Sequence, residues 1–161
     1  MKHQASLALI KFLSDLAKSL GVSRHVYVVG GAVRNFVMDP TGRKYPVKDI
    51  DVVIDSVALS GKDSDWFAKE VAKAIPARTN ITTNQYGVAL LNIVGDWMLG
   101  DANLKGEDIE IANARTESYG QGGYTPESVE KSTIEQDVGR REFTFNTLLW
   151  RMHDLANGPD K

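Results

Sequence analysis

Apolar residues near the start of the chain recur at intervals of three and four positions. The set comprises Leu9, Phe12, Leu13, Leu16, Ala17 and Leu20. This spacing places all of them on one face of a helix. Gly21 follows directly, and glycine is favoured just beyond the end of a helix. The pattern therefore predicts an amphipathic helix that ends at Gly21.

A short apolar run, Val26–Val29, comes next and stops at Gly30 and Gly31. Four β-favouring residues bounded by glycine are typical of a short buried strand. Residues 32–38 then predict a short helix, which must end before Pro40 because the residue that precedes proline avoids the helical conformation. This part of the chain thus predicts a strand, a glycine turn and a helix.

Acidic and apolar residues alternate in the first half of segment 49–54 and at the start of segment 108–114. Alternation with a period of two is the pattern of a strand with one buried face. Gly95 and Asp96 are flanked by β-favouring residues and predict a hairpin turn. Further β-favouring runs predict strands at 78–83, 87–94 and 97–99.

The remaining helices are expected after a cap at Ser64 or Asp65 and up to Ile75, from Ser128 or Ser132 onward, and over residues 143–150. Residues 119–127 contain three glycines and a proline, which predicts a mobile loop. Together the elements predict an α+β fold in which helices flank a mixed β-sheet. We expect a single domain over residues 1–155 and a frayed tail at 156–161.

The composition is that of an ordinary globular domain. The 161 residues carry 19 lysines and arginines against 21 aspartates and glutamates, and the net charge of −2 argues against coating long nucleic acids through charge alone. No apolar stretch approaches the roughly 18 residues of a membrane span, and no secretory signal is visible, so we expect a cytoplasmic protein without membrane contact. The absence of cysteine excludes disulfide scaffolds, zinc ribbons and thiol nucleophiles.

Asp49 and Asp51 are the first candidates for chemistry. Side chains two positions apart in a strand project from the same face, roughly 6.5 Å apart. Two carboxylates so placed can bind one or two divalent cations, an arrangement that two-metal phosphoryl-transfer sites need. The alternative is an exposed polar face of the strand, which a lone Asp-x-Asp pattern does not exclude.

Gly30, Gly31 and Arg34 form a second candidate, where a strand passes into a helix. Glycine lets backbone N–H groups approach a phosphate, the helix N-terminus favours negative charge, and arginine can bind phosphate through two hydrogen bonds. Neither the dinucleotide fingerprint nor a Walker A loop is present. A glycine pair that serves only as a turn is the alternative.

Two further segments carry charged residues. Glu110 would add a third carboxylate to Asp49 and Asp51 if its strand lies next to theirs. Otherwise it is an exposed acidic residue. Arg140 and Arg141 lie in a segment of mixed charge, which is usually a solvated surface and becomes a binding element only beside a triphosphate.

Taken in order, these segments resemble the head domain of the class II CCA-adding enzymes and bacterial poly(A) polymerases, within the DNA polymerase β-like nucleotidyltransferase superfamily. The matching segments are residues 27–34 (YVVGGAVR), 48–52 (KDIDV), 109–117 (IEIANARTE) and 140–146 (RREFTFN). Four motifs in the same order argue against a chance match. The resemblance implies a polymerase β-like palm fold and a nucleotidyltransferase.

The resemblance also implies a reaction and its residues. Asp49, Asp51 and Glu110 would be the catalytic carboxylates that bind Mg²⁺, with two ions expected. The nucleotide, ATP or CTP, would meet Gly30, Gly31, Arg34, Arg140, Arg141 and Asn146. A nucleoside monophosphate would pass to a 3′-hydroxyl of an RNA such as tRNA, with release of pyrophosphate. Catalysis of this kind depends on positioning and charge stabilisation and needs no nucleophilic side chain.

The sequence departs from the family pattern at several places. Asn35 and Glu142 stand where the family usually has aspartate, and the segment between residues 87 and 110 is longer, with Trp97 and a polar loop added. The helical neck, body and tail domains of the family, which select the nucleotide and bind tRNA, are expected to be absent.

These departures leave two other functions open. The acceptor could be a protein or a small molecule, because the charge is near neutral and the RNA-binding domains are missing. The chain could also be a catalytically silent nucleotide-binding or assembly subunit, completed by a partner chain that supplies the missing helices.

Overall fold

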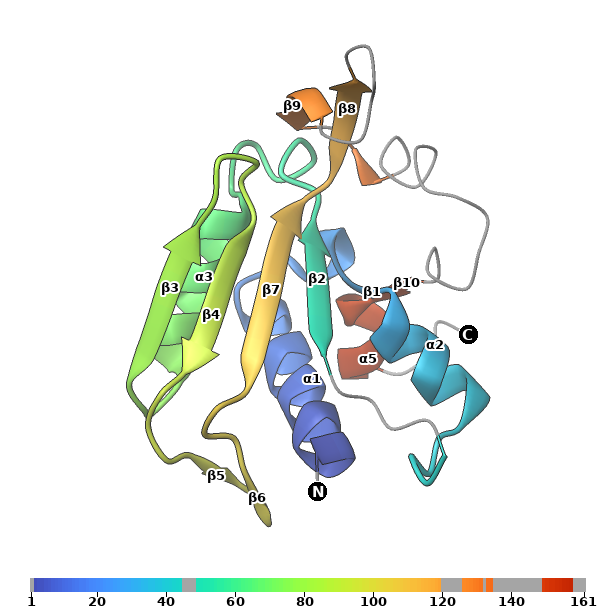
Figure 1. Cartoon of the computed structure of the whole chain (residues 1–161), viewed down its shortest axis with the longest axis vertical. Helices are drawn as coiled ribbons and strands as arrows, with labels where there is room; N and C mark the ends of the chain where they lie inside the picture. Colours follow the sequence, from blue (N-terminus) through green and yellow to red (C-terminus); the bar gives the residue numbers. More distant parts are fainter. Residues whose placement is uncertain (1, 45–48, 120–125, 132, 135–148, 158–161) are drawn as a thin grey trace.

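The computed structural model describes residues 2–44, 49–119, 126–131, 133–134 and 149–157 (Figure 1). Its helical segments are α1 (Lys2–Ser19), the 3-10 helix η1 (Ser23–His25), α2 (Gly31–Met38), α3 (Ser64–Ala74) and α5 (Met152–Asn157). Its strands are β1 (Val26–Val29), β2 (Ile50–Ile54), β3 (Thr79–Thr83), β4 (Ala89–Ile93), β5 (Met98–Leu99), β6 (Ala102–Asn103), β7 (Asp108–Asn113), β8 (Arg115–Tyr119), β9 (Pro126–Lys131) and β10 (Leu149–Arg151). The first predicted helix, strand and short helix are confirmed as α1, β1 and α2.

Six strands form one sheet in the order β10-β1-β2-β7-β4-β3. Strands β2 and β7 run parallel, whereas the other neighbours are antiparallel. The predicted mixed sheet with flanking helices is therefore confirmed. The parallel pair needs a long crossover, which α3, β3 and β4 supply.

Alternate residues of the strands form the main core against α1 and α3. In β2, Ile50, Val52 and Ile54 are buried, and they share one apolar cluster with Leu9 and Leu13 of α1. Figure 1 shows α1 and α3 on the same side of the sheet, behind the strands in that view. Fully burying a side chain of this size stabilises the fold by about 1.5–3 kcal/mol. The opposite face of the central strands, which α1 and α3 do not cover, is the open face of the sheet.

A second, smaller apolar cluster lies on that opposite face, near β1 and β2. It comprises Tyr27, Val29, Val53, Ala114 and Ile134. Residues of β1 and β2 alternate between the two clusters, as the pleat of a strand requires. The open face thus begins with an apolar cluster at β1 and continues with the polar positions of β2 and β7.

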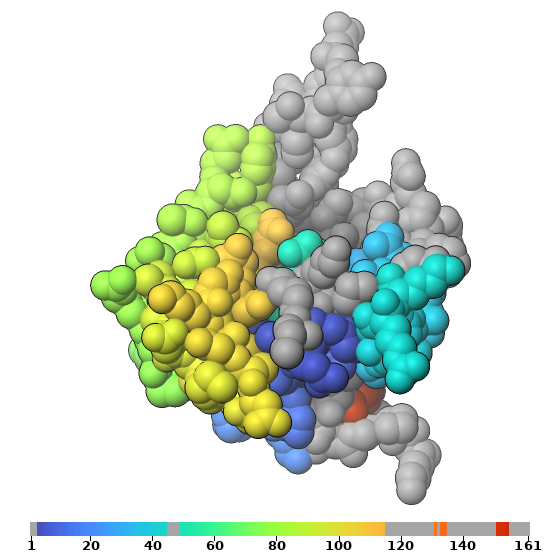
Figure 2. All heavy atoms as spheres, turned by 60° about the horizontal axis from the view of Figure 1, so that its bottom comes forward, coloured from blue at the N-terminus to red at the C-terminus, as the bar shows by residue number. Residues whose placement is uncertain are grey.

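The segment that exceeds the family pattern folds as the β5–β6 hairpin. The prediction of a turn at Gly95 and Asp96 is wrong: β5 pairs with β6, and the hairpin turns at Gly100, whose φ of 64° suits glycine. Trp97 packs edge-on against Phe12 of α1, with ring centroids 4.8 Å apart, which holds the hairpin beside that helix. Figure 2 shows the yellow hairpin next to the blue start of α1.

Two predicted helices are corrected near the end of the chain. A helix from Ser128 is wrong, because that residue lies in β9, which pairs with β8. Ile134 is helical, in agreement with a start after Ser132, and the residues that follow lie outside the described part. Of the helix predicted at 143–150, residues 143–148 lie outside the described part, and Leu149 and Trp150 belong to β10, because pairing there satisfies the backbone groups of β1.

The loop predicted at 119–127 is shorter in the structure, because Tyr119 ends β8 and Pro126 begins β9. Residues 120–125 lie outside the described part of the chain. Asp63, one residue earlier than predicted, caps α3 by accepting a hydrogen bond from the Trp66 N–H. No helix among the described residues is long and apolar enough to cross a membrane.

Candidate functional site

A row of register partners crosses the open face of the sheet. From β1 to β3 it runs through Val29, Asp51, Glu110, Leu90 and Thr82. Neighbouring strands lie about 4.8 Å apart, and register partners project from the same face. Asp51 and Glu110 are direct partners on the parallel strands β2 and β7. The condition that Glu110 lie on a strand next to that of Asp51 is therefore met.

The third predicted carboxylate, Asp49, immediately precedes β2. Asp49 and Glu110 are exposed, whereas Asp51 is half-buried between the fully buried Ile50 and Val52. The strand thus holds Asp51 firmly and leaves its carboxylate at the surface of the open face. Asp51 and Glu110 thus lie side by side on the open face, and Asp49 lies two positions before Asp51 in the sequence.

Carboxylate oxygens are ligands that Mg²⁺ prefers, and the ion is usually held by one or two of them together with substrate phosphates and water. Among the described residues, no group of three or more histidine, cysteine, aspartate or glutamate side chains could by itself hold a metal ion. Asp51 and Glu110, as direct register partners, suit a magnesium ion that is shared with a bound phosphate, and the part of Asp49 in such a site stays a prediction. Two carboxylates do not fit a closed structural metal site.

The glycine turn after β1 lies beside Asp51. A Cβ added to Gly30 would be 3.7 Å from Asp51 Oδ2. The φ of 74° and ψ of −138° at Gly30 form a conformation that residues with a side chain rarely adopt. The backbone therefore passes directly beside the carboxylate before it enters α2.

Arg34 lies in the first turn of α2 and folds back over the glycines. Its Nη2 would be 3.4 Å from a Cβ added to Gly31, and its Nε donates a hydrogen bond to Asn35 Oδ1 at 3.2 Å. Asn35, one of the departures from the family pattern, thus contacts the arginine that precedes it. A guanidinium and the N-terminus of an eight-residue helix stand together at the turn, an arrangement that suits a phosphate.

The other predicted nucleotide-binding residues, Arg140, Arg141 and Asn146, lie outside the described residues, as does Glu142. The structure therefore brings together the glycine turn, Arg34, Asp51 and Glu110, while the arginine segment stays a prediction.

Two carboxylates in the connection between β2 and α3 are not foreseen by the motifs. Asp55 is buried and accepts a hydrogen bond from the Ile134 N–H, and Asp63 accepts one from Lys131 Nζ. No motif marks Asp55, because Val53 interrupts the alternation of Asp49 and Asp51 before it. Its partner is remote in sequence, so no local pattern could identify it.

Comparison with known proteins identifies a family and several relatives. The Poly A polymerase head domain matches residues 26–158. The A-adding tRNA nucleotidyltransferase of Halalkalibacterium halodurans is 30% identical over 152 residues, which cover 94% of this chain and 30% of that protein. The CCA-adding enzyme of Lactobacillus helveticus is 31% identical over 137 residues, or 82% of this chain and 28% of that enzyme.

A third relative is the CC-adding tRNA nucleotidyltransferase of Deinococcus radiodurans, 28% identical over 144 residues, which cover 89% of this chain and 32% of that protein. The chain therefore spans only about 30% of the length of these relatives.

Proposed function

The chain belongs to the Poly A polymerase head domain family, and we propose that it transfers a nucleoside monophosphate from a nucleoside triphosphate to the 3′-hydroxyl of an RNA. The observation that carries the proposal is the pairing of Asp51 with Glu110 on adjacent parallel strands, directly beside Gly30. Carboxylates for a metal and a glycine turn for phosphates thus adjoin each other on an open sheet face.

The triphosphate is held at the start of α2. Backbone N–H groups at Gly30 and Gly31 face the phosphates, and the guanidinium of Arg34 neutralises part of their charge. Asn35 keeps the guanidinium oriented through its bond to Nε. From the second half of the chain, Arg140, Arg141 and Asn146 contact the phosphates and the ribose.

Asp49, Asp51 and Glu110 hold magnesium, with two ions expected. When bound, the metal polarises the α-phosphate and lowers the pKa of the attacking hydroxyl. In the reaction the 3′-hydroxyl gives its proton to water, its oxygen bonds to the α-phosphorus, and the bond from that phosphorus to the bridging oxygen breaks as pyrophosphate leaves. Because Asp51 is half-buried, its carboxylate stays fixed while negative charge passes from the attacking oxygen to the leaving pyrophosphate.

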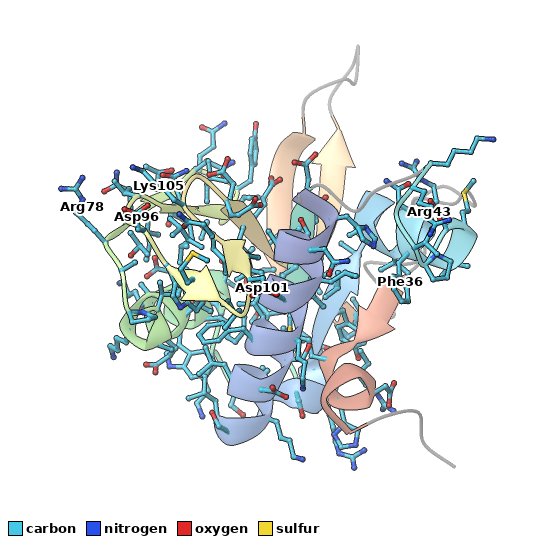
Figure 3. All side chains as sticks on the ribbon, turned by 90° about the horizontal axis from the view of Figure 1, so that it is seen from below. Phe36, Arg43, Arg78, Asp96, Asp101 and Lys105 are labelled. Atoms are coloured by element: carbon cyan, nitrogen blue, oxygen red, sulfur yellow. The ribbon has the colours of Figure 1, made fainter. Side chains whose placement is uncertain are left out.

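A tRNA 3′ end is the acceptor that the relatives favour. Their names describe A-adding, CCA-adding and CC-adding enzymes, at 30%, 31% and 28% identity. The word tRNA in two of these names favours RNA as the acceptor. Because relatives that add A, CCA or CC match the chain about equally well, the comparison favours neither ATP nor CTP. The exposed Arg43 lies after α2 (Figure 3), six positions before Asp49, and offers a positive charge in the chain segment that leads to Asp49.

The experiment incubates the protein with magnesium, a tRNA pool and each of the four α-labelled ribonucleoside triphosphates in turn. We expect labelled RNA with ATP or CTP, and its loss in Asp49→Ala. Label in a protein or metabolite fraction alone would instead identify a different acceptor. Triphosphate binding without turnover would favour a silent subunit that needs a partner chain.

A further inference from the structure

The open face of the sheet continues past Glu110 onto β4 and β3, where it carries an exposed leucine. Leu90 of β4 is the register partner of Glu110, and it also pairs with Thr82 of β3. Leu90 is 42% exposed. Register partners project from the same face of a sheet, one strand spacing of about 4.8 Å apart. A large apolar side chain thus faces water one strand away from a predicted metal ligand, and the proposed metal and triphosphate contacts do not use it.

The surroundings of Leu90 on β3 and β4 are polar and uncharged. Thr82 and Asn80 are exposed, and Asn92, the register partner of Asn80, is half-buried. On the neighbouring β7, Asp108 accepts a hydrogen bond from Asn92 Nδ2. Hydroxyl and amide groups beside an apolar side chain suit the base and ribose of a nucleotide, whereas phosphates call for charged donors and backbone N–H groups. This surface therefore fits a nucleoside.

The glycine turn lies on the other side of the two carboxylates. Gly30 follows β1, and α2 lies against β1 and β2, whereas β4 and β3 lie beyond β7 in the sheet. Figure 1 shows α2 to the right of β2 and β7, with β4 and β3 to their left. Asp51 and Glu110 thus stand between the proposed triphosphate site and the surface around Leu90.

The geometry of phosphoryl transfer determines from which side the acceptor approaches. The attacking and leaving oxygens lie roughly in line through the phosphorus. With the phosphates at Gly30 and Gly31, pyrophosphate leaves toward α2, so the attacking hydroxyl comes from the β4 side. We propose that the 3′-terminal nucleoside of the acceptor RNA lies on the β3–β4 part of the open face and contacts Leu90. This inference rests on the proposed function, from which it takes the position of the triphosphate.

Three substitutions of Leu90 test the proposal in the full chain. Leu90→Asp places a carboxylate where the RNA end would lie, Leu90→Ala removes the apolar contact, and Leu90→Met retains an apolar side chain of similar size. Met98→Asp is the matched control, because Met98 is also apolar and is 58% exposed, but lies in β5 of the hairpin. Since both positions are exposed, these substitutions should change stability little, which thermal unfolding checks.

The KM for a tRNA transcript is measured with saturating Mg-ATP or Mg-CTP, and the Kd for each nucleotide is measured without RNA. We expect the KM for RNA to rise about tenfold or more in Leu90→Asp and about fivefold in Leu90→Ala. Leu90→Met should restore most of the affinity that Leu90→Ala loses, and Met98→Asp should keep the wild-type KM. The Kd for the nucleotide should stay the same in all variants, whereas a purely structural role of Leu90 would change both quantities.

A crosslinking measurement locates the RNA end without any turnover. An RNA whose 3′-terminal nucleoside is 4-thiouridine is irradiated with the wild-type protein, and the tryptic peptides are analysed by mass spectrometry. Trypsin cleaves after Arg78 and after Lys105, so β3 and β4 lie in one peptide. We expect the crosslink within residues 80–92 of that peptide.

A wild-type KM for RNA in Leu90→Asp and Leu90→Ala, or a crosslink confined to other peptides, would overturn the acceptor position, while transfer by the wild-type protein would still support the proposed function. A parallel rise in the Kd for the nucleotide would also overturn it, because Leu90 would then act on the fold or on the triphosphate. If the wild-type protein transfers no nucleotide to RNA, the proposed function fails, and the acceptor position fails with it.

Discussion

Asp51 and Glu110 face each other as register partners on the parallel strands β2 and β7, on the side of the sheet that α1 and α3 leave open. The pairing depends on the order of the strands, since β7 reaches β2 only after the chain has passed through α3, β3 and β4. It places a half-buried and an exposed carboxylate one strand spacing apart, next to the glycine turn at Gly30.

Neutralising either carboxylate should abolish most of the transfer activity. We expect Asp51→Asn and Glu110→Gln to lower kcat/KM about 100- to 1,000-fold, because several kcal/mol of charge stabilisation is lost. Both replacements keep the shape of the side chain, so thermal unfolding should change little. Asp101→Asn, on the exposed β5–β6 hairpin, is the control and should retain full activity. Comparable activity in all three variants would place the chemistry elsewhere.

The two glycines of the turn should respond differently to alanine. Gly30→Ala imposes a side chain on a φ of 74° and should cost about 1–3 kcal/mol of stability as well as triphosphate binding. At Gly31 the φ is not positive, and the added Cβ would meet only the mobile end of Arg34. We therefore expect Gly31→Ala to fold normally and to bind triphosphate more weakly, as calorimetry and thermal unfolding can show. Equal stability of the two variants would contradict this assignment.

Asp63 should make stability depend on pH. Partial burial opposes its ionisation, but hydrogen bonds from the Trp66 N–H and from Lys131 outweigh that effect and hold its pKa below the ordinary value of 3.8. A lowered pKa adds stability that is present above the unfolded pKa and is lost as pH falls through the folded one. Asn also caps helices well, so Asp63→Asn should cost less than about 1 kcal/mol at neutral pH.

Denaturant unfolding of wild type and Asp63→Asn across the acid range provides the measurement. The difference in unfolding free energy should shrink as pH falls below about 4. A difference that is the same at neutral pH and at pH 3 would show that the Asp63 charge has no part in it.

Trp97 should matter for stability and not for chemistry. Its side chain is 7% exposed and packs against Phe12, so Trp97→Ala should lower the unfolding free energy by about 3–5 kcal/mol. At a temperature where the variant is folded, its kcat per folded molecule should match the wild type. A selective fall in kcat would give the hairpin a functional role that its position does not suggest.

Periodicity was sufficient to predict α1, because one apolar face repeats from Leu9 to Leu20 and Gly21 ends the pattern. The same holds for β2 and β7, whose alternation separates core from open face. Trp150 shows where local pattern fails: an apolar run is compatible with helix or strand, and the choice of β10 depends on the unpaired edge of β1.

Some residues in and around the candidate site could be predicted from the sequence, and others could not. Gly30, Asp51 and Glu110 could be predicted because each lies in a motif of its own, although only the sheet order shows that they adjoin. Asp55 could not, since its partner Ile134 is 79 positions away and contributes a backbone N–H that any residue but proline would supply. Long-range bonds to the backbone leave no residue pattern in the sequence.

The central claim is that this chain transfers the α-phosphoryl unit of a nucleoside triphosphate, with its nucleoside, to an RNA 3′ end. The most direct measurement compares α-labelled and γ-labelled triphosphate in parallel reactions with magnesium and tRNA. The account predicts that the α-label enters RNA, that the γ-label appears only in pyrophosphate, and that Asp51→Asn abolishes both. RNA that acquires the γ-label, or no label from any triphosphate, would contradict it.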